Sequence, residues 1–87
     1  MAQHSKIALV TGGSRGLGKN MALALAHQGI DVVITYHSRA DEAQSVVTDI
    51  EALGQKAAAL QLDASNVASF GAFFQQLSAT LGSTFGA

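Results

Sequence analysis

Apolar residues follow two patterns that alternate along this chain. Residues 6–10, 31–36 and 56–62 form short runs in which most neighbouring positions are apolar. Such runs are typical of strands that are buried on both faces of a parallel sheet. After each run, apolar residues recur every three or four positions, which predicts amphipathic helices at 17–28, 38–53 and 66–81.

Each predicted helix carries a characteristic stripe. The first has the small residues Gly18, Ala22 and Ala26, which let a helix lie close against a sheet. The apolar stripes of the second and third are Ala43, Val46, Val47, Ile50 and Leu53, and Val67, Phe70, Phe74, Leu77 and Leu81.

Residues that begin and end helices stand at the expected places. Gly29, Gly54 and Gly82 each follow a helical stripe, where glycine closes a helix at little conformational cost. The segment 38–41, Ser-Arg-Ala-Asp, fits a capping box, and Asn66 fits an N-cap. The predicted order is therefore strand, helix, strand, helix, strand, helix.

This order predicts an α/β fold of the Rossmann type, a doubly wound parallel sheet with the strands in the order 3-2-1. The first strand then lies at the edge of the three and exposes an apolar edge that a further strand would normally cover. We therefore expect residues 1–87 to be the N-terminal portion of a single dinucleotide-binding domain whose remainder is absent from this chain. The alternative is a small non-catalytic nucleotide-binding module, complete in itself.

A glycine-rich segment, TGGSRGLG at residues 11–18, joins the first strand to the first helix. Phosphate groups bind at helix N-termini, which offer free N–H groups and the positive end of the helix dipole. Glycine lets the backbone turn sharply and approach a ligand with no Cβ in the way. The segment therefore predicts a site for the phosphates of a dinucleotide.

The spacing of the glycines separates three classes of nucleotide site. The common dinucleotide pattern G-x-G-x-x-G does not match residues 11–18. The phosphate loop G-x-x-x-x-G-K-[ST] fits residues 13–20 except at Asn20, where a hydroxyl should bind Mg²⁺, so a phosphate-loop protein stays a minor alternative. The pattern T-G-x-x-x-G-x-G fits without exception.

With this pattern the chain resembles the short-chain dehydrogenase/reductase family, and in particular the 3-oxoacyl-carrier-protein reductases. The resemblance extends from about residue 6 to residue 81 and includes LVTGGSRGLG at 9–18 and Leu62-Asp63 after the third strand. It implies a nicotinamide dinucleotide cofactor and hydride transfer between that cofactor and a small carbonyl or alcohol substrate.

The resemblance also implies roles for single residues. Contacts with the pyrophosphate and ribose fall to the glycine turn, at Gly12, Ser14, Gly16, Leu17 and Gly18. Asp63 corresponds to the family aspartate that accepts a hydrogen bond from the adenine amino group, with Ala64 beside the ring, where the family more often has valine. Asp63 also fits a turn residue that caps the next helix.

The end of the second strand predicts which dinucleotide binds. NAD sites usually place an acid there, and that acid repels the 2′-phosphate of NADP. The residues at this position are Tyr36, His37, Ser38 and Arg39. Arg15 and Arg39 offer guanidinium groups to a phosphate, although Arg39 and His37 fit solvated surface residues equally well. Because the first acid, Asp41, falls in the predicted helix, we expect NADP(H) as the cofactor, bound by these residues.

The family's catalytic signature, Y-x-x-x-K, does not occur in the sequence. The single tyrosine, Tyr36, is followed four positions later by Ala40. We therefore predict no catalytic residue in this chain, and we expect the substrate to bind residues outside it, in a homodimer or homotetramer. There is no cysteine, and the three histidines lack metal-ligand spacing, so no metal site is predicted.

Charge and composition argue against some classes of binding partner. The net charge is −1 and the basic residues form no run, which argues against nucleic acid and acidic membrane surfaces as partners. No segment has the length and hydrophobicity of a signal peptide or a membrane span, so a cytoplasmic protein is expected.

Overall fold

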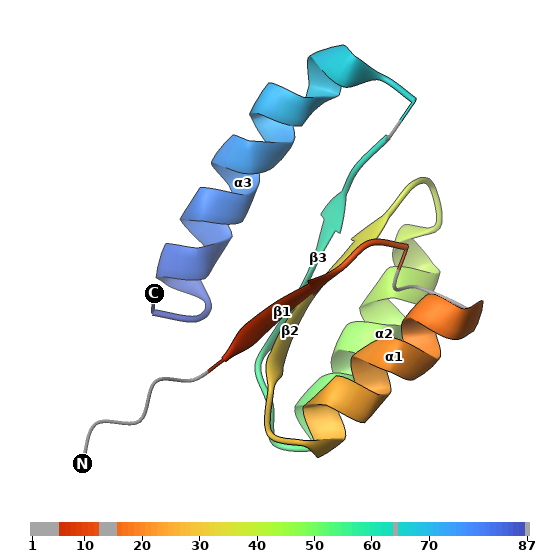
Figure 1. Ribbon diagram of the computed structural model, residues 1–87, viewed down its shortest axis with the longest axis vertical. Coiled ribbons are helices and arrows are strands. Elements are labelled where there is room, and N and C mark those ends of the chain that lie inside the picture. Colours follow the sequence, from red (N-terminus) through yellow and green to blue (C-terminus); the bar gives the residue numbers. More distant parts are fainter. Residues whose placement is uncertain (1–5, 13–15, 64, 87) are drawn as a thin grey trace.

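The sheet has three parallel strands with β2 in the middle. The computed structural model describes residues 6–12, 16–63 and 65–86. Its strands lie in the order β1 (Ile7–Val10), β2 (Asp31–Tyr36), β3 (Ala57–Gln61) (Figure 1). Both neighbours pair with β2 in parallel, which confirms the predicted Rossmann-type α/β fold and the strand order 3-2-1.

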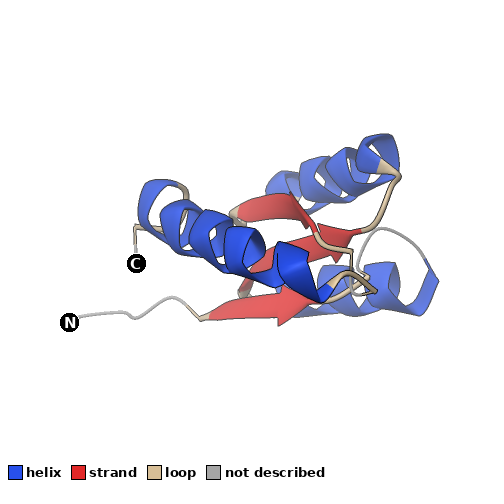
Figure 2. Cartoon of the chain, turned by 90° about the horizontal axis from the view of Figure 1, so that it is seen from above, coloured by secondary structure: helices blue, strands red, loops and turns tan. Residues whose placement is uncertain are grey.

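Helices cover both faces of the sheet. On one face α1 (Gly16–His27) packs against β1 and β2, and α2 (Ala40–Ala52) packs against β2 and β3. On the other face α3 (Phe70–Ser83), which follows the short 3₁₀ turn η1 (Val67–Ser69), packs against β3 (Figure 2). Because the three strands run in parallel, their carboxyl ends all lie at the same edge of the sheet.

The main core lies between the sheet and the pair α1 and α2. Ala22 and Ala26 are 0% and 2% exposed, and their small side chains let α1 lie close to the strands. The apolar stripe predicted for α2 is buried except at its last position, Leu53. The buried cluster consists of Val10, Ala22, Ala26, Val32, Ile34, Ala43, Val46, Val47, Ile50 and Ala57.

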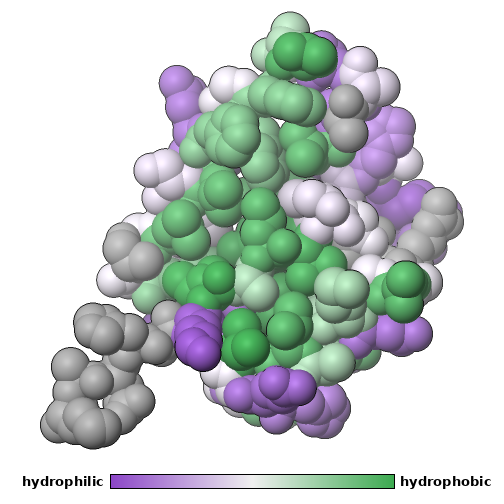
Figure 3. Space-filling view, viewed as in Figure 1, coloured by the Kyte–Doolittle hydropathy of each residue, from purple (hydrophilic) through white to green (hydrophobic). Residues whose placement is uncertain are grey.

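The edge strand β1 is less buried than its sequence predicts. An apolar run predicts burial on both faces, but Leu9 is 47% exposed and Val10 alone in this strand is buried. The reason is that α3 packs over β3 and, within the described residues, does not reach β1. In the view of Figure 1, where β1 lies in front, apolar side chains gather across the centre of the molecule (Figure 3).

Asp31, a buried residue, connects the amino ends of the three strands through its backbone and its carboxylate. The Asp31 N–H, at the start of β2, donates to the carbonyl of Lys6 at 2.9 Å. Asp31 Oδ1 accepts hydrogen bonds from the Lys56 N–H at 3.0 Å and from Gln55 Nε2 at 2.8 Å. These bonds compensate the burial of the charge and tie the three strands together at the end where they begin.

The start of α2 differs from the prediction. Arg39 occupies the N-cap position and no side chain caps the helix, so the capping box predicted at 38–41 does not form. The physical reason is that the carboxylate of Asp41, which the capping box required, contacts the guanidinium of Arg39 instead.

The last helix also differs in phase and in length. Asn66 Oδ1 accepts a hydrogen bond from the Ala68 N–H, which confirms Asn66 as an N-cap, but the first turn is a 3₁₀ turn. Because a 3₁₀ turn has about three residues, it rotates the helix that follows. As a result Phe73 is buried and Phe74 is 60% exposed, and the helix continues past the predicted stop at Gly82.

We predict that Ile34→Ala lowers the free energy of unfolding by about 3 kcal/mol, because Ile34 is fully buried and its loss leaves a cavity. Val67→Ala shortens a side chain that is 76% exposed and should change that free energy by less than about 0.5 kcal/mol. Urea denaturation measures both variants. Equal losses would contradict the position of the core.

Candidate functional site

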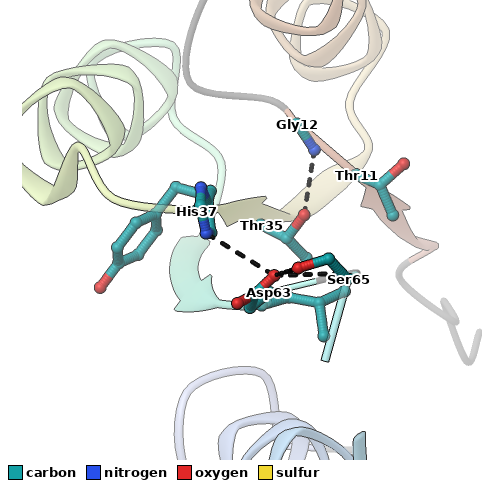
Figure 4. A pocket seen from close by; sticks show the side chains of 8 residues that line it. Thr11, Gly12, Thr35, His37, Asp63 and Ser65 are labelled. Carbon is teal, nitrogen blue, oxygen red and sulfur yellow. Dashed lines mark hydrogen bonds and ion pairs between the residues drawn. The ribbon is translucent and has the colours of Figure 1, made fainter. Parts of the chain in front are cut away.

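The carboxyl ends of the strands surround a cavity of about 500 Å³ (Figure 4). Open α/β sheets bind their ligands at this edge, outside the carboxyl ends of the strands. The residues that line the cavity are Thr11, Gly12, Thr35, Tyr36, His37, Leu62, Asp63 and Ser65. They come from the ends of all three strands, so the cavity exists only when the sheet is assembled.

The glycine turn borders this cavity. Gly12 has φ +68° and Gly16 has φ +63°, a backbone region that other residues rarely adopt. Chain neighbours apart, a Cβ atom added at either glycine would have no described residue within 4 Å, so the described part of the chain leaves the backbone there open to a ligand. Gly16, Leu17 and Gly18 form the start of α1, where Leu17 is 78% exposed.

Thr35 connects the glycine turn to the central strand. The Gly12 N–H donates a hydrogen bond to Thr35 Oγ1 at 3.0 Å. Thr35 is 3% exposed, and its hydroxyl is the one polar group in the run Val-Val-Ile-Thr of β2. Thr35 was not predicted as a site residue, although a hydroxyl at the end of the buried apolar run Val-Val-Ile was a usable signal.

The last residue of β2 and the three residues that follow it fall into two groups, according to whether they line the cavity. Tyr36 and His37 line the cavity, and the carbonyl of His37 accepts a hydrogen bond from Gln61 Nε2 at 3.0 Å. Ser38 and Arg39 are exposed and are not among the lining residues. No carboxylate follows directly on the end of β2, in agreement with the sequence.

The guanidinium of Arg39 is directed toward the first turn of α2. Its Nε lies 3.5 Å from Asp41 Oδ1, and one terminal nitrogen lies 3.5 Å from Glu42 Oε2. The hydrogen bond with Asp41, and then the charge of Glu42, raise the pKa of Arg39. The first turn of α1, in contrast, contains no acidic residue, so its positive dipole end is not neutralised by its own side chains.

Within the described part of the chain, the contacts that hold the carboxylate of Asp63 all fall on one oxygen. Oδ1 accepts hydrogen bonds from Ser65 Oγ at 2.6 Å and from the Ser65 N–H at 3.0 Å, and it lies 3.6 Å from His37 Nε2. The bond from the Ser65 hydroxyl, followed by that from its N–H, lowers the pKa of Asp63.

Asp63 therefore forms a turn and also borders the cavity. Its bond to the Ser65 N–H is that of an Asx turn, whereas the N-cap of η1 is Asn66. Ser65 was not identified from the sequence, because its role depends on the direction of the Asp63 side chain.

Four of the predicted cofactor-binding residues line the cavity, namely Gly12, Tyr36, His37 and Asp63. The predicted residues Ser14, Arg15 and Ala64 lie outside the described residues. A second hollow, also of about 500 Å³, lies between β3 and α3 and is bordered by Ala59, Ala72 and Phe73 among others. None of the described residues of the glycine turn borders this second hollow.

Metal-binding clusters and membrane-spanning helices are both missing from the described residues. In the ranges 6–12, 16–63 and 65–86, no group of three or more His, Cys, Asp or Glu residues could hold a metal ion. Over the same ranges, no helix has the length and hydrophobicity needed to cross a membrane.

The fold and the glycine turn between β1 and α1 define a Rossmann-type protein. The chain belongs to the short-chain dehydrogenase family, whose model matches residues 6–84. This match confirms the resemblance on which the sequence analysis relied.

Individual relatives agree with this assignment. The hydroxynaphthalene reductase of Aspergillus fumigatus is 44% identical over 72 residues, which are 83% of this chain and 26% of the relative. A 3-oxoacyl-[acyl-carrier-protein] reductase of Aggregatibacter actinomycetemcomitans is 48% identical over 61 residues, 70% of this chain and 25% of the relative. The chain thus spans about a quarter of the length of these curated relatives.

A solved structure gives the same result. A short chain dehydrogenase from Burkholderia cenocepacia, in complex with NADP, matches with a TM-score of 0.78 and 45% identity. The match covers 88% of this chain and 31% of that one.

We predict that Ser65→Ala raises the pKa of Asp63, because it removes the hydroxyl that donates to Oδ1 and keeps the N–H that also does. The lowered pKa stabilises the folded chain above the ordinary pKa of an aspartate. This contribution is lost as the pH falls through the lowered value.

An NMR titration of the Asp63 carboxyl carbon measures the shift. Ser45→Ala, at an exposed position of α2, is the control and should leave the Asp63 titration unchanged. An unchanged pKa in Ser65→Ala would contradict the role of the hydroxyl.

Proposed function

We propose that this chain is the N-terminal part of an NADP-dependent short-chain oxidoreductase and that it binds the adenosine half of NADP(H). The observation that carries this proposal is the glycine turn, which places Gly12 and Gly16 in positive-φ backbone between β1 and α1. The turn borders the cavity at the carboxyl ends of the strands, where Rossmann folds bind dinucleotides.

The glycine turn and the start of α1 fit the phosphates of such a cofactor. The start of α1 offers backbone N–H groups, and no acid in its first turn opposes an anion. The open space beside Gly12 and Gly16 leaves room for a phosphate close to the backbone. We assign the pyrophosphate and ribose contacts to Gly12, Ser14, Gly16, Leu17 and Gly18.

Asp63 fits the adenine ring. Its contacts with described residues all fall on Oδ1, so Oδ2 is available to accept a hydrogen bond from the exocyclic amino group. The lowered pKa keeps the side chain ionised, and therefore an acceptor, at neutral pH. We place Ala64 beside the ring.

The proposal favours NADP over NAD. An acid at the end of β2 would bind the ribose hydroxyls of NAD and repel the 2′-phosphate, whereas this chain has Tyr36, His37 and Ser38 there. We propose Arg15 as the main partner of the 2′-phosphate. Arg39 is a second partner once its exposed guanidinium leaves Asp41 and Glu42, contacts of a kind that contribute little. The relative in complex with NADP supports this choice.

The chemical step needs residues outside this chain. The bound cofactor supplies or accepts a hydride at its nicotinamide, with a small carbonyl or alcohol as the other reactant. This chain lacks the catalytic Y-x-x-x-K signature, since Ala40 stands four positions after Tyr36. Its residues therefore have the role of binding and orienting the adenosine half.

The rest of the protein would cover surface that this chain leaves open. The free edge of β1 and the exposed Leu9 support a sheet that continues beyond the three strands. For the full-length protein we expect a cytoplasmic homodimer or homotetramer.

We predict that Arg15→Ala weakens NADPH binding by about ten-fold or more, since charge-assisted hydrogen bonds to the 2′-phosphate are lost, and that NADH binding changes by less than about two-fold. Lys56→Ala is the matched control: it removes one positive charge just before β3, at the opposite end of the sheet. Calorimetric titration with each cofactor gives the dissociation constants. Equal losses for NADPH and NADH would show that Arg15 does not contact the 2′-phosphate.

A further inference from the structure

In the part of the turn after β1 that the structure describes, one side chain, that of Thr35, connects the turn to the central strand. The backbone pairing of β1 with β2 ends at Val10, opposite Ile34. Two residues later, the Gly12 N–H donates its hydrogen bond to Thr35 Oγ1 at 3.0 Å (Figure 4). Beyond the last backbone pair of β1 and β2, the side chain of Thr35 therefore provides the hydrogen bond between the two segments.

Thr35 is a rigid acceptor for this bond. The residue is 3% exposed and lies in the strand that is paired on both sides. Its side chain is branched at Cβ, which restricts rotation about χ1. The position of the hydroxyl is therefore set by the sheet and not by the loop.

Gly12, in contrast, depends on an outside constraint. At φ +68° it has no Cβ, and glycine populates both signs of φ with similar ease. Apart from Gly12 and its two chain neighbours, no atom of the described residues lies within 4 Å of the place where a Cβ would be, so no packing contact there restrains Gly12. The bond to Thr35 therefore fixes the direction of the Gly12 amide.

We propose that Thr35 is a positioning residue of the nucleotide site, which holds Gly12 in the geometry that receives the pyrophosphate. The inference rests on the proposed function. Thr35 acts through Gly12. Because it directly precedes Tyr36 and His37, it also links the pyrophosphate side of the cavity to the side that receives the 2′-phosphate.

Three variants of the chain test this role. Thr35→Val keeps the shape of the side chain and removes the acceptor, while Thr35→Ser keeps the hydroxyl. Thr48→Val makes the same chemical change at an exposed position of α2, away from the cavity. The ligands are NADPH and 2′-AMP, because 2′-AMP carries adenine, ribose and the 2′-phosphate but no pyrophosphate.

Loss of the hydrogen bond between Thr35 and Gly12 should weaken the binding of NADPH but not that of 2′-AMP. Thr35→Val should weaken NADPH binding by about ten-fold and 2′-AMP binding by less than about two-fold. Thr35→Ser and Thr48→Val should bind NADPH within about two-fold of the unaltered chain. General destabilisation does not produce this split, because at a temperature where every variant is folded it leaves both dissociation constants unchanged.

Three results would overturn the inference alone: NADPH binding by Thr35→Val equal to that of the unaltered chain, equal losses for both ligands, or a loss in Thr35→Ser as large as in Thr35→Val. An unaltered chain that binds no NADPH would overturn the proposed function and this inference together.

Amide hydrogen exchange in the unaltered chain adds a readout that needs neither variant nor ligand. The Gly12 amide should exchange more slowly than an amide without a partner. Unprotected exchange at Gly12 would also overturn the inference.

Discussion

The parallel pairing of β2 with both neighbours is the constraint on which the candidate site depends. Residues 31–35 of this strand are all buried, so its register and the direction of its side chains are strongly fixed. Where the strand ends, Thr35 bonds the Gly12 amide on one side, and His37 contacts Asp63 on the other. A shift of β2 by one residue would turn Thr35 to the opposite face and separate the three strand ends.

The charges at this edge of the sheet differ between the two helices that begin there. The first turn of α2 carries Asp41 and Glu42, and both carboxylates lie near the guanidinium of Arg39. The first turn of α1 carries no acid. The start of α1, beside the glycine turn, would therefore attract an anionic ligand. The charge of Arg39 at the start of α2 is partly neutralised by Asp41 and Glu42.

Local patterns predicted most of the fold. β2 has the predicted bounds, and the small residues Ala22 and Ala26 lie against the sheet as expected, because both features follow from spacing along the chain. The phase of α3 could not be predicted, since a 3₁₀ turn placed Phe73 inward. The exposure of Leu9 depends on what covers an edge strand, and the sequence of that strand does not contain this information.

The same limit applies to the candidate site. Gly12 and Asp63 were identified from motifs, and the structure places both at one cavity. Thr35 was missed because its partner lies 23 residues away along the chain, and Ser65 because its bonds depend on side-chain direction. Motifs therefore predicted the residues proposed to contact the ligand, and the structure was needed to find those that hold them in place.

The central claim is that the cavity at the strand ends binds the adenosine half of NADP(H). The most direct test is an NMR titration of the ¹⁵N-labelled chain with NADPH. We predict that the largest amide shifts occur at Gly12, Thr35, Tyr36, His37 and Asp63, the cavity residues at the three strand ends. Shifts confined to Ala59, Ala72 and Phe73, which border the hollow between β3 and α3, would contradict it, as would shifts at the strand ends with ATP and Mg²⁺ but none with NADPH.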